Sequence, residues 1–291
     1  TGLMGRLAGT ILKVAGRTSS FYFKGRNETL AAIGSTLGVA HVLEGSVRKQ
    51  GDRLRISAKL LRVSDGVEMW ADTFDGTDAD IFALQESIAQ RVTSELRVAL
   101  DAGQQTRLVA AGTTNPEAYA LYLRAAAIFD RRDISSFPTA VAALEQAIAL
   151  DPKFARAYSR LSALTTIGAA YGGVDLQQDH ERVMQLAGAA LALDPTLAEP
   201  HAVMGQSFAR LTGGLLQQRQ SFERALQLDP DDVTSNFWFG LTLVNTGYRA
   251  EGIARIERAL ELDPMLPNAL RWRGVTYLFD GDLDRAEDYL T

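Results

Sequence analysis

Hydrophobic and polar residues follow two different periods along this chain. Between residues 43 and 72 they alternate one by one, as in a β-strand with one buried face, and turn sequences interrupt the alternation at residues 50–52 and 64–66. From residue 117 onward, apolar residues recur three and four positions apart, which is the period of an α-helix. The pattern predicts an α+β N-terminal domain followed by an all-α domain.

The alternating stretch predicts a three-stranded antiparallel meander. The residues expected on its apolar face are Leu43, Gly45, Val47, Leu54, Ile56, Ala58, Leu60, Val67, Met69 and Ala71, which leaves Trp70 on the opposite face. Thr77 and Asp80 have the spacing of a capping box, and the helix that they begin carries an apolar stripe to about residue 100. This helix can cover the apolar face of the sheet.

Weaker signals precede the meander. Leucines near helical spacing predict a helix over residues 3–12, and residues 13–17 are compatible with a short strand. Asn27 is a suitable N-cap for a helix that begins at Glu28, and Gly38 is placed to end that helix in the left-handed conformation.

A repeated phrase organises the helical part. The pattern Ala-x-x-Leu-Asp-Pro ends at Pro152, Pro195, Pro230 and Pro264, which are 43, 35 and 34 residues apart. A period of about 34 residues is typical of a helix-turn-helix solenoid. The small alanine lets a neighbouring helix approach closely, and the proline stops the helix because it cannot continue the hydrogen-bond ladder.

These patterns divide the chain into three segments. Residues 1–100 form the α+β domain, and residues 117–291 form about four to five helix pairs, of which the last is incomplete. Residues 101–116 have the Gly, Thr, Asn and Pro content of a linker, with a short helix expected around residues 105–110.

Composition and charge exclude several classes of protein. The chain has no cysteine, so it has neither disulfides nor thiolate zinc sites. The net charge of −5, without a strongly basic half, argues against direct nucleic-acid binding. No apolar run approaches the roughly 18 residues that span a bilayer. The chain begins at Thr1 inside an apparent helix, which suggests a piece of a longer protein, and both cytoplasm and periplasm remain open as its location.

Small residues recur in register within the helical repeats. The clearest set is Gly240, Ala259 and Pro264, and its equivalents in the preceding unit are Gly205, Ala225 and Pro230. In this respect residues 117–291 resemble the tetratricopeptide repeat (TPR) family, although Gln218 and Gly252 depart from its pattern. The resemblance implies a TPR superhelix that binds protein segments.

Several ordered motifs mark the first hundred residues. They include GRTSSF at 16–21, VLEGSVR at 42–48, DRLRI at 52–56, Trp70 with Ala71, and DIFALQ at 80–85. With these motifs the segment resembles the TolB amino-terminal-like α/β domain of bacterial signalling proteins, whose usual first strand would precede Thr1. In that family the pair of domains is fused to a winged-helix DNA-binding domain, as in CadC-type regulators, or to a nucleotide cyclase domain.

Candidate catalytic and metal-binding groups are scattered. His41, His180 and His201 lie in separate units without metal-ligand spacing, and we expect them to be structural or exposed. The acidic residues Asp72, Asp75, Asp78 and Asp80 fit turns and helix caps better than a calcium loop. Residues 16–20 lack the Gly-Lys-Ser/Thr ending of a phosphate loop. We therefore expect no catalytic residue, no metal and no cofactor in this segment.

Charged residues on the strands form a further candidate. Arg48, Arg53, Arg55 and Lys59 could attract an acidic partner. Glu44, Glu68 and Asp72 can lie across from them, however, so a solvated face with cross-strand ion pairs is the better interpretation.

The first helices of successive repeats line the concave surface of a solenoid. The TPR register places on it, as candidate partner-binding residues, Tyr119, Tyr122, Arg156, Ser159, Gln206, Phe237, Leu241, Asn245 and Arg271. Aromatic and Arg side chains commonly anchor peptides. Tyr119, Tyr122 and Phe237 could equally well only pack against the adjoining repeat.

The sequence as a whole favours a non-enzymatic sensory or interaction module that binds a protein segment or a second copy of itself. Two alternatives remain open. One is a structural scaffold of a cell-envelope assembly, and the other is an accessory region whose cyclase domain lies elsewhere in the parent chain.

Overall fold

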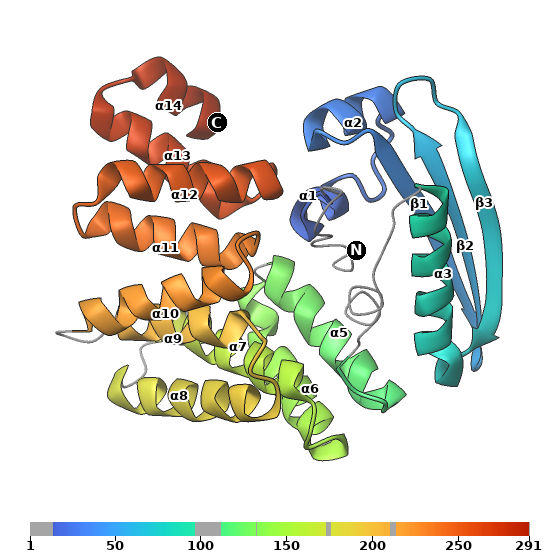
Figure 1. Ribbon diagram of the computed structural model, residues 1–291, viewed down its shortest axis with the longest axis horizontal. Coiled ribbons are helices and arrows are strands. Elements are labelled where there is room, and N and C mark those ends of the chain that lie inside the picture. Colours follow the sequence, from blue (N-terminus) through green and yellow to red (C-terminus); the bar gives the residue numbers. More distant parts are fainter. Residues whose placement is uncertain (1–13, 97–111, 132, 173–175, 210–213, 291) are drawn as a thin grey trace. The chain divides into compact units, whose positions relative to one another are not determined.

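The computed structural model describes residues 14–96, 112–131, 133–172, 176–209 and 214–290 (Figure 1). The chain divides into two compact units, residues 1–116 and residues 117–291, each of which is described by itself. The helices predicted over residues 3–12 and 105–110 lie outside the described residues.

The first unit contains one antiparallel sheet and three α-helices in its described part. In chain order the elements are α1 (Arg17–Tyr22), α2 (Leu30–Leu37), β1 (His41–Gln50), β2 (Arg53–Arg62), β3 (Glu68–Thr77), a 3₁₀ turn (Asp78–Asp80) and α3 (Ile81–Glu95). The strand order is β1-β2-β3, so β2 is central and the predicted meander is confirmed.

Two predictions before the meander are wrong. The strand expected over residues 13–17 is absent from its described part: residues 14–16 form no strand, and α1 begins at Arg17, because the backbone N–H and the hydroxyl of Ser20 both donate to the carbonyl oxygen of Gly16 and close a turn. Helix α2 begins at Leu30 and not at Glu28, since the Thr29 hydroxyl is the cap that accepts from the Ala32 N–H. The predicted end is confirmed, with Gly38 in the left-handed conformation at φ 61°.

The core of this unit lies between the sheet and α3. Ala58, Leu60, Trp70 and Val92 form a buried cluster. The strand register places Trp70 opposite Leu60, and a bulge follows between Leu60 and Leu61. The apolar face assigned to the third strand is therefore wrong, because Trp70 points into the core whereas Ala71 is exposed.

The start of α3 follows the predicted capping box. A carboxylate oxygen of Asp80 accepts hydrogen bonds from both the N–H and the hydroxyl of Thr77, each at 2.8 Å. These two bonds hold the pKa of Asp80 below its usual value, because they favour the charged carboxylate.

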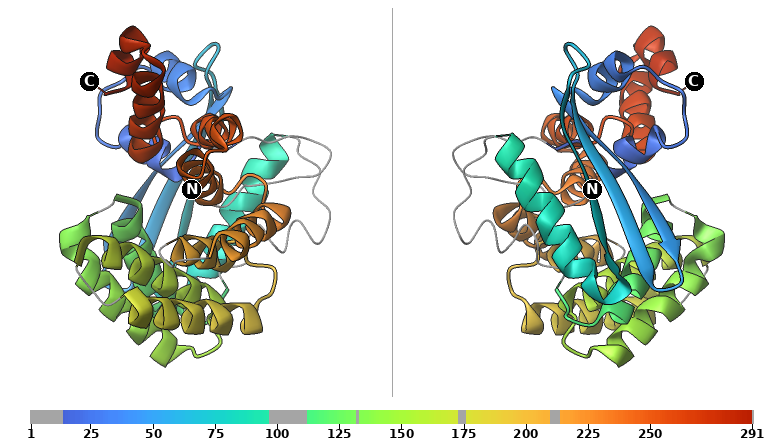
Figure 2. Two further views of the ribbon diagram at one scale, coloured as in Figure 1. Left: turned by 90° about the vertical axis from the view of Figure 1, so that its left-hand side faces the viewer. Right: turned by 90° about the vertical axis from the view of Figure 1, so that its right-hand side faces the viewer.

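The second unit is all α-helical apart from short connections in its described part. The helices are α5 (Pro116–Arg131), α6 (Phe137–Leu150), α7 (Ala155–Gly172), α8 (Leu176–Leu193), α9 (Glu199–Phe208), α10 (Leu215–Leu228), α11 (Val233–Asn245), α12 (Arg249–Leu262), α13 (Pro267–Asp280) and α14 (Leu283–Leu290), with a 3₁₀ turn at Ile134–Ser136. Within the unit, α7 packs on α8 and α9, and α11 packs on α9 and α12 (Figure 2). The predicted TPR-type array of helix pairs is confirmed.

The recurring Asp-Pro ends each second helix by two hydrogen bonds, as the first repeat shows. The Asp151 N–H donates to the carbonyl of Ala147 at 2.9 Å, and the Asp151 carboxylate accepts from the Lys153 N–H at 3.0 Å. Asp194 and Asp229 make the same pair of bonds. The aspartate therefore supplies hydrogen-bond partners for backbone groups at the end of the helix, where the proline has no N–H to donate.

Helices α11 and α12 approach each other at two glycines. A Cβ atom added at Gly240 would lie 2.8 Å from the Gly252 carbonyl oxygen, and one added at Gly252 would lie 2.6 Å from the Gly240 carbonyl oxygen. Gly252 departs from the TPR pattern, and this contact gives the physical reason for it.

We predict that Gly240→Ala lowers the free energy of unfolding by about 2 kcal/mol, because overpacking outweighs the better helix propensity of alanine. Gly188→Ala in α8 is the matched control. A Cβ atom added at Gly188 would have no atom within 4 Å apart from its chain neighbours and the nearby backbone of its own helix. That control should stabilise the protein by about 0.5–1 kcal/mol. Urea unfolding of both variants measures the difference, and equal effects would contradict the close approach.

Candidate functional site

The predicted partner-binding residues lie on the first helices of the repeats. Tyr119 and Tyr122 belong to α5, Arg156 and Ser159 to α7, Gln206 to α9, Phe237, Leu241 and Asn245 to α11, and Arg271 to α13. Residues of the set that share a helix are three or four positions apart or combine these spacings, so they lie along one stripe of that helix.

The structure buries three of these nine side chains. Ser159 is 1% exposed, Phe237 6% and Tyr119 9%. Their bulk or hydroxyl group is used in packing between helices, so the interpretation of these three as accessible contacts is wrong. Tyr122, Arg156, Gln206 and Leu241 are partly exposed, and Asn245 and Arg271 are exposed.

Two residues that the sequence analysis missed extend the stripe on α13. Leu278 follows Arg271 by seven positions, and Phe279 follows by eight. They are 50% and 76% exposed. Helical spacing from Arg271 was the signal that could have found them.

Aromatic rings connect α5 to the start of α7. The ring of Tyr122 stacks on that of Tyr119 at a centroid distance of 6.3 Å and lies 5.2 Å from that of Phe154. Phe154 is fully buried. The ring of Tyr122 is therefore fixed by packing from two sides.

Arg160 on α7 is the centre of a polar cluster that joins three first helices. Its guanidinium lies 3.1 Å from a Glu199 carboxylate oxygen of α9 and 3.9 Å from an Asp130 carboxylate oxygen of α5. It also lies 4.5 Å from the centroid of the Phe129 ring. Ser159 donates a hydrogen bond to the other carboxylate oxygen of Glu199.

The acids of this cluster favour the cationic form of Arg160. Burial opposes the charge of Arg160, but Glu199 first, then Tyr122 and Asp130, outweigh burial and raise its pKa. The Nε atom of Arg160 is buried without a hydrogen-bond partner. The cluster therefore connects α5, α7 and α9 through buried and partly buried polar groups.

Asp232 is a partly buried acid at the N-cap of α11. Its carboxylate accepts a hydrogen bond from the Ser235 N–H at 2.6 Å and so caps the helix. Burial raises the pKa of Asp232 above its usual value, although hydrogen bonds from Ser235 oppose this effect. A cap position was readable from the sequence, whereas the burial of its charge was not.

The histidines occupy separate environments. His180 Nδ1 lies 2.9 Å from the Ser207 hydroxyl oxygen, and its ring lies 5.1 Å from that of Phe208. Burial, followed by the charge of Arg224, lowers the pKa of His201. Within the described ranges, no group of three His, Asp or Glu residues is placed to hold a metal ion.

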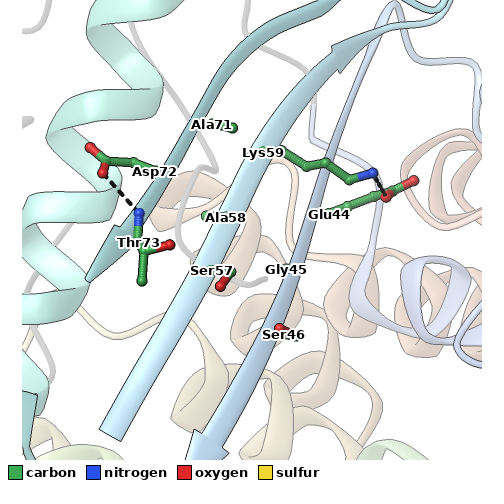
Figure 3. A pocket seen from close by; sticks show the side chains of 9 residues that line it. All are labelled: Glu44, Gly45, Ser46, Ser57, Ala58, Lys59, Ala71, Asp72 and Thr73. Atoms are coloured by element: carbon green, nitrogen blue, oxygen red, sulfur yellow. Dashed lines mark hydrogen bonds and ion pairs between the residues drawn. The ribbon is translucent and has the colours of Figure 1, made fainter. Parts of the chain in front are cut away.

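The charged strand residues are paired across the sheet. Lys59 Nζ lies 2.8 Å from a Glu44 carboxylate oxygen (Figure 3). Arg55 makes two hydrogen bonds of 2.7 and 3.0 Å to Asp75. Cross-strand pairing is confirmed, although Asp72 instead accepts from the N–H of Thr73. An open depression of about 610 Å³ around the Lys59–Glu44 pair is lined mainly by small side chains.

Comparison with known proteins gives distant relatives. No family model matches the chain. Putative adenylate cyclase 3 of Rhizobium meliloti (strain 1021) is 35% identical over 153 residues, which is 53% of this chain and 26% of that protein. The chain thus matches about a quarter of the length of this relative.

Two solved structures illustrate the likeness in fold. TTC0263, a thermophilic TPR protein of Thermus thermophilus, is 16% identical with a TM-score of 0.49, and the match covers 59% of this chain and 87% of that chain. YrrB, a TPR protein with an unusual peptide-binding site, is 20% identical with a TM-score of 0.32, over 59% and 82%. The helix pairs of this chain, from α5 to α14, are therefore the evidence for its fold. Among the described residues, no helix is both long and apolar enough to cross a membrane.

We predict that Arg160→Ala lowers the free energy of unfolding by about 3 kcal/mol, because it leaves Glu199 and Asp130 without their buried cation. Arg182→Ala is the matched control. Arg182 pairs with Glu145 at 3.9 Å, and both side chains are about half exposed, so its loss should change stability by less than about 1 kcal/mol. Equal losses in chemical denaturation would show that the Arg160 cluster is not a structural tie.

We predict that Asp232→Asn stabilises the protein at pH 7. The folded state holds the Asp232 proton more tightly than the unfolded chain, so wild-type stability falls as pH rises through the unfolded pKa of about 4. The variant avoids this loss and keeps the cap, and its advantage should grow from pH 3.5 to 7.

Asp133→Asn is the control of opposite sign for this prediction. Hydrogen bonds from Ser135 and Ser136 lower the pKa of Asp133, so its charge stabilises the fold above that pKa. The control should lose stability relative to wild type as pH rises. Urea unfolding at each pH measures both trends, and a constant difference for Asp232→Asn would contradict the buried charge.

Proposed function

We propose that this chain is a non-enzymatic protein–protein interaction module of a multidomain bacterial signalling protein. In this assignment residues 1–100 form a TolB-type domain, residues 101–116 a linker, and residues 117–291 a TPR array. The first-helix face of the array, defined by Tyr122, Arg156, Gln206, Leu241, Asn245 and Arg271 and extended by Leu278 and Phe279, binds a protein or peptide partner.

The observation that carries the proposal is the array of helix pairs, whose first helices carry exposed and partly exposed polar and apolar side chains along one stripe. On α13, Leu278 and Phe279 follow Arg271 by seven and eight positions, and both apolar side chains are at least half exposed. An exposed apolar group beside an arginine is typical of surfaces that anchor a partner. On α11, Leu241 and Asn245 continue the same combination of apolar and polar groups.

The match to a putative adenylate cyclase favours a nucleotide cyclase over a transcriptional regulator as the parent protein. The match covers 26% of that relative, so the output domain would lie elsewhere in the parent chain. A partner on the first-helix face would then change the output only if it binds two arrangements of the parent with different affinities.

A displayed library of random 12-residue peptides, selected on the 291-residue chain, tests the proposal. We expect selected peptides whose affinity falls about tenfold or more, which is about 1.4 kcal/mol, with Arg271→Glu or Phe279→Ser. Both positions are exposed, so neither variant should lower the thermal stability.

Leu216→Ser is the matched control for this experiment. Leu216 is 64% exposed, close to the 76% of Phe279, but it lies on the second helix α10. Its replacement should leave peptide affinity unchanged, as measured by fluorescence anisotropy. Peptides that respond to Leu216→Ser and not to Phe279→Ser would refute binding on the first-helix face.

A further inference from the structure

The face of the sheet that points away from α3 carries polar side chains in ordered rows. Ala58, Leu60 and Trp70 cluster with Val92 of α3, so the residues that alternate with them on the strands point the other way. The strand register arranges these residues in three adjacent cross-strand rows, which are Glu44, Lys59 and Ala71, then Ser46, Ser57 and Thr73, then Arg48, Arg55 and Asp75. A strand added at either edge would lie in the plane of the sheet, so it would not cover this face.

The middle row lines a depression in this face. Ser46, Ser57 and Thr73 are small and exposed, and they lie next to one another on the three strands (Figure 3). The open depression of about 610 Å³ is lined by this row and by the Lys59–Glu44 pair. The three hydroxyl groups have no hydrogen-bond partner within the described residues, so each can both donate to and accept from a ligand.

Ion pairs neutralise only two of the four basic residues on this face. Lys59 has the ion pair described above, and Arg55 donates to both carboxylate oxygens of Asp75. Within the described ranges, Arg48 and Arg53 make neither an ion pair nor a side-chain hydrogen bond. Hydrogen bonds from Arg55, and to a smaller extent the charge of Arg53, hold the pKa of Asp75 below its usual value. One carboxylate therefore serves two arginines, and Arg48 has none.

The strand register also brings cations together. Arg48 lies directly opposite Arg55, and Arg53 precedes Arg55 by two positions on the same face. Like charges opposite each other destabilise a sheet. This excess of positive charge, in a chain whose net charge is −5, is unfavourable for the fold alone and indicates a surface that meets an anionic ligand.

The remaining sequence of the first unit supplies too few acids to neutralise these arginines. The segments of this unit outside the described ranges, residues 1–13 and 97–111, contain four basic residues and a single acid, Asp101. They add positive charge to the unit instead of balancing it. The carboxylates that would neutralise both Arg48 and Arg53 therefore have to come from outside this unit.

We propose that this face binds an acidic segment of a protein partner. Arg48 and Arg53 hold carboxylate groups of the segment, because a planar guanidinium group can bind a carboxylate through two hydrogen bonds. The hydroxyl groups of Ser46, Ser57 and Thr73 bind neighbouring polar groups of the segment. This is a second binding surface, in addition to the first-helix face.

Shape and charge favour an acidic peptide over other anionic ligands. The depression is open and lined mainly by small side chains, whereas apolar and aromatic groups usually enclose a small molecule. The four basic residues and two acids of this face leave two positive charges, which is too few for the strongly basic face of a nucleic-acid-binding protein. Hydroxyl groups beside arginines match the mixture of carboxylate and backbone groups that a peptide presents.

Fluorescence anisotropy tests the proposal with the 291-residue chain and a labelled peptide that has a run of glutamates between Gly-Ser spacers. We expect this peptide to bind, and its affinity to fall about tenfold or more in the double variant Arg48→Gln/Arg53→Gln, which loses the charge-assisted hydrogen bonds. The same peptide with glutamine in place of glutamate should not bind. No binding of the glutamate peptide, or equal binding of both peptides, would overturn the proposal.

Lys24→Gln/Arg26→Gln is the matched control for this double variant. Both residues are exposed cations of the first unit that lie over the aromatic rings of Phe21 and Tyr22. The control removes the same charge and should leave the affinity unchanged. Equal losses in the two double variants would mean that the peptide responds only to the overall charge, and would refute a site on the sheet.

Ser57→Tyr locates the site without changing any charge. Ser57 is exposed on the central strand, and tyrosine is well tolerated in strands, so the variant should fold. Its ring would fill the depression and lower the affinity about tenfold. Phe279→Ser, on the first-helix face, should leave binding of the glutamate peptide unchanged. A loss in Phe279→Ser with full affinity in Ser57→Tyr would place the peptide on the first-helix face and overturn this proposal alone.

Arg48→Glu separates a binding role from a structural one. A glutamate opposite Arg55 replaces a like-charge pair by an opposite-charge pair, so the midpoint of urea unfolding should rise while peptide binding is lost. A lower midpoint would mean that Arg48 stabilises the fold, and would contradict the proposal. A labelled single-stranded oligonucleotide should bind more weakly than the glutamate peptide. Tighter binding that is lost in Arg48→Gln/Arg53→Gln would assign the face to nucleic acid instead.

Discussion

The helical unit depends on how closely neighbouring helices can approach. Each Ala-x-x-Leu-Asp-Pro phrase places a fully buried alanine four residues before the aspartate that ends the helix, at Ala147, Ala190, Ala225 and Ala259. At one contact even a methyl group is too large, and Gly240 faces Gly252. A helix pair of this kind cannot bury its apolar face alone, so the small residues are what allow neighbouring pairs to stack and form a continuous core.

Charged groups within the array also stabilise its helices. Arg160 reaches from α7 to acids on α5 and α9, and Asp232 caps α11 at the expense of burying its carboxylate. The Arg160 contacts connect three repeats, whereas the Asp232 cap is local to α11. In both arrangements other groups compensate a charge that is removed from solvent. Other charged and apolar side chains of the first helices are exposed to solvent instead. On α13 these are Arg271, Leu278 and Phe279.

The sheet of the first unit shows the effect of incomplete cover. Helix α3 protects the side of the sheet around Leu60, Trp70 and Val92, but the apolar row continues to β1 beyond that cluster. Leu43 and Val47 in that part of the row remain 40% and 65% exposed.

The sequence by itself determined the meander, the capping box at Thr77 and the period of the helix pairs, because each depends on residues close together in the chain. It did not determine that Trp70 faces the core, since the side of a strand is decided by its register with a neighbour. It placed nine candidate contacts on the first helices, but only tertiary packing decided that Tyr119, Ser159 and Phe237 are buried. The Arg160 cluster joins residues as far apart in the chain as Asp130 and Glu199, so no local pattern could reveal it.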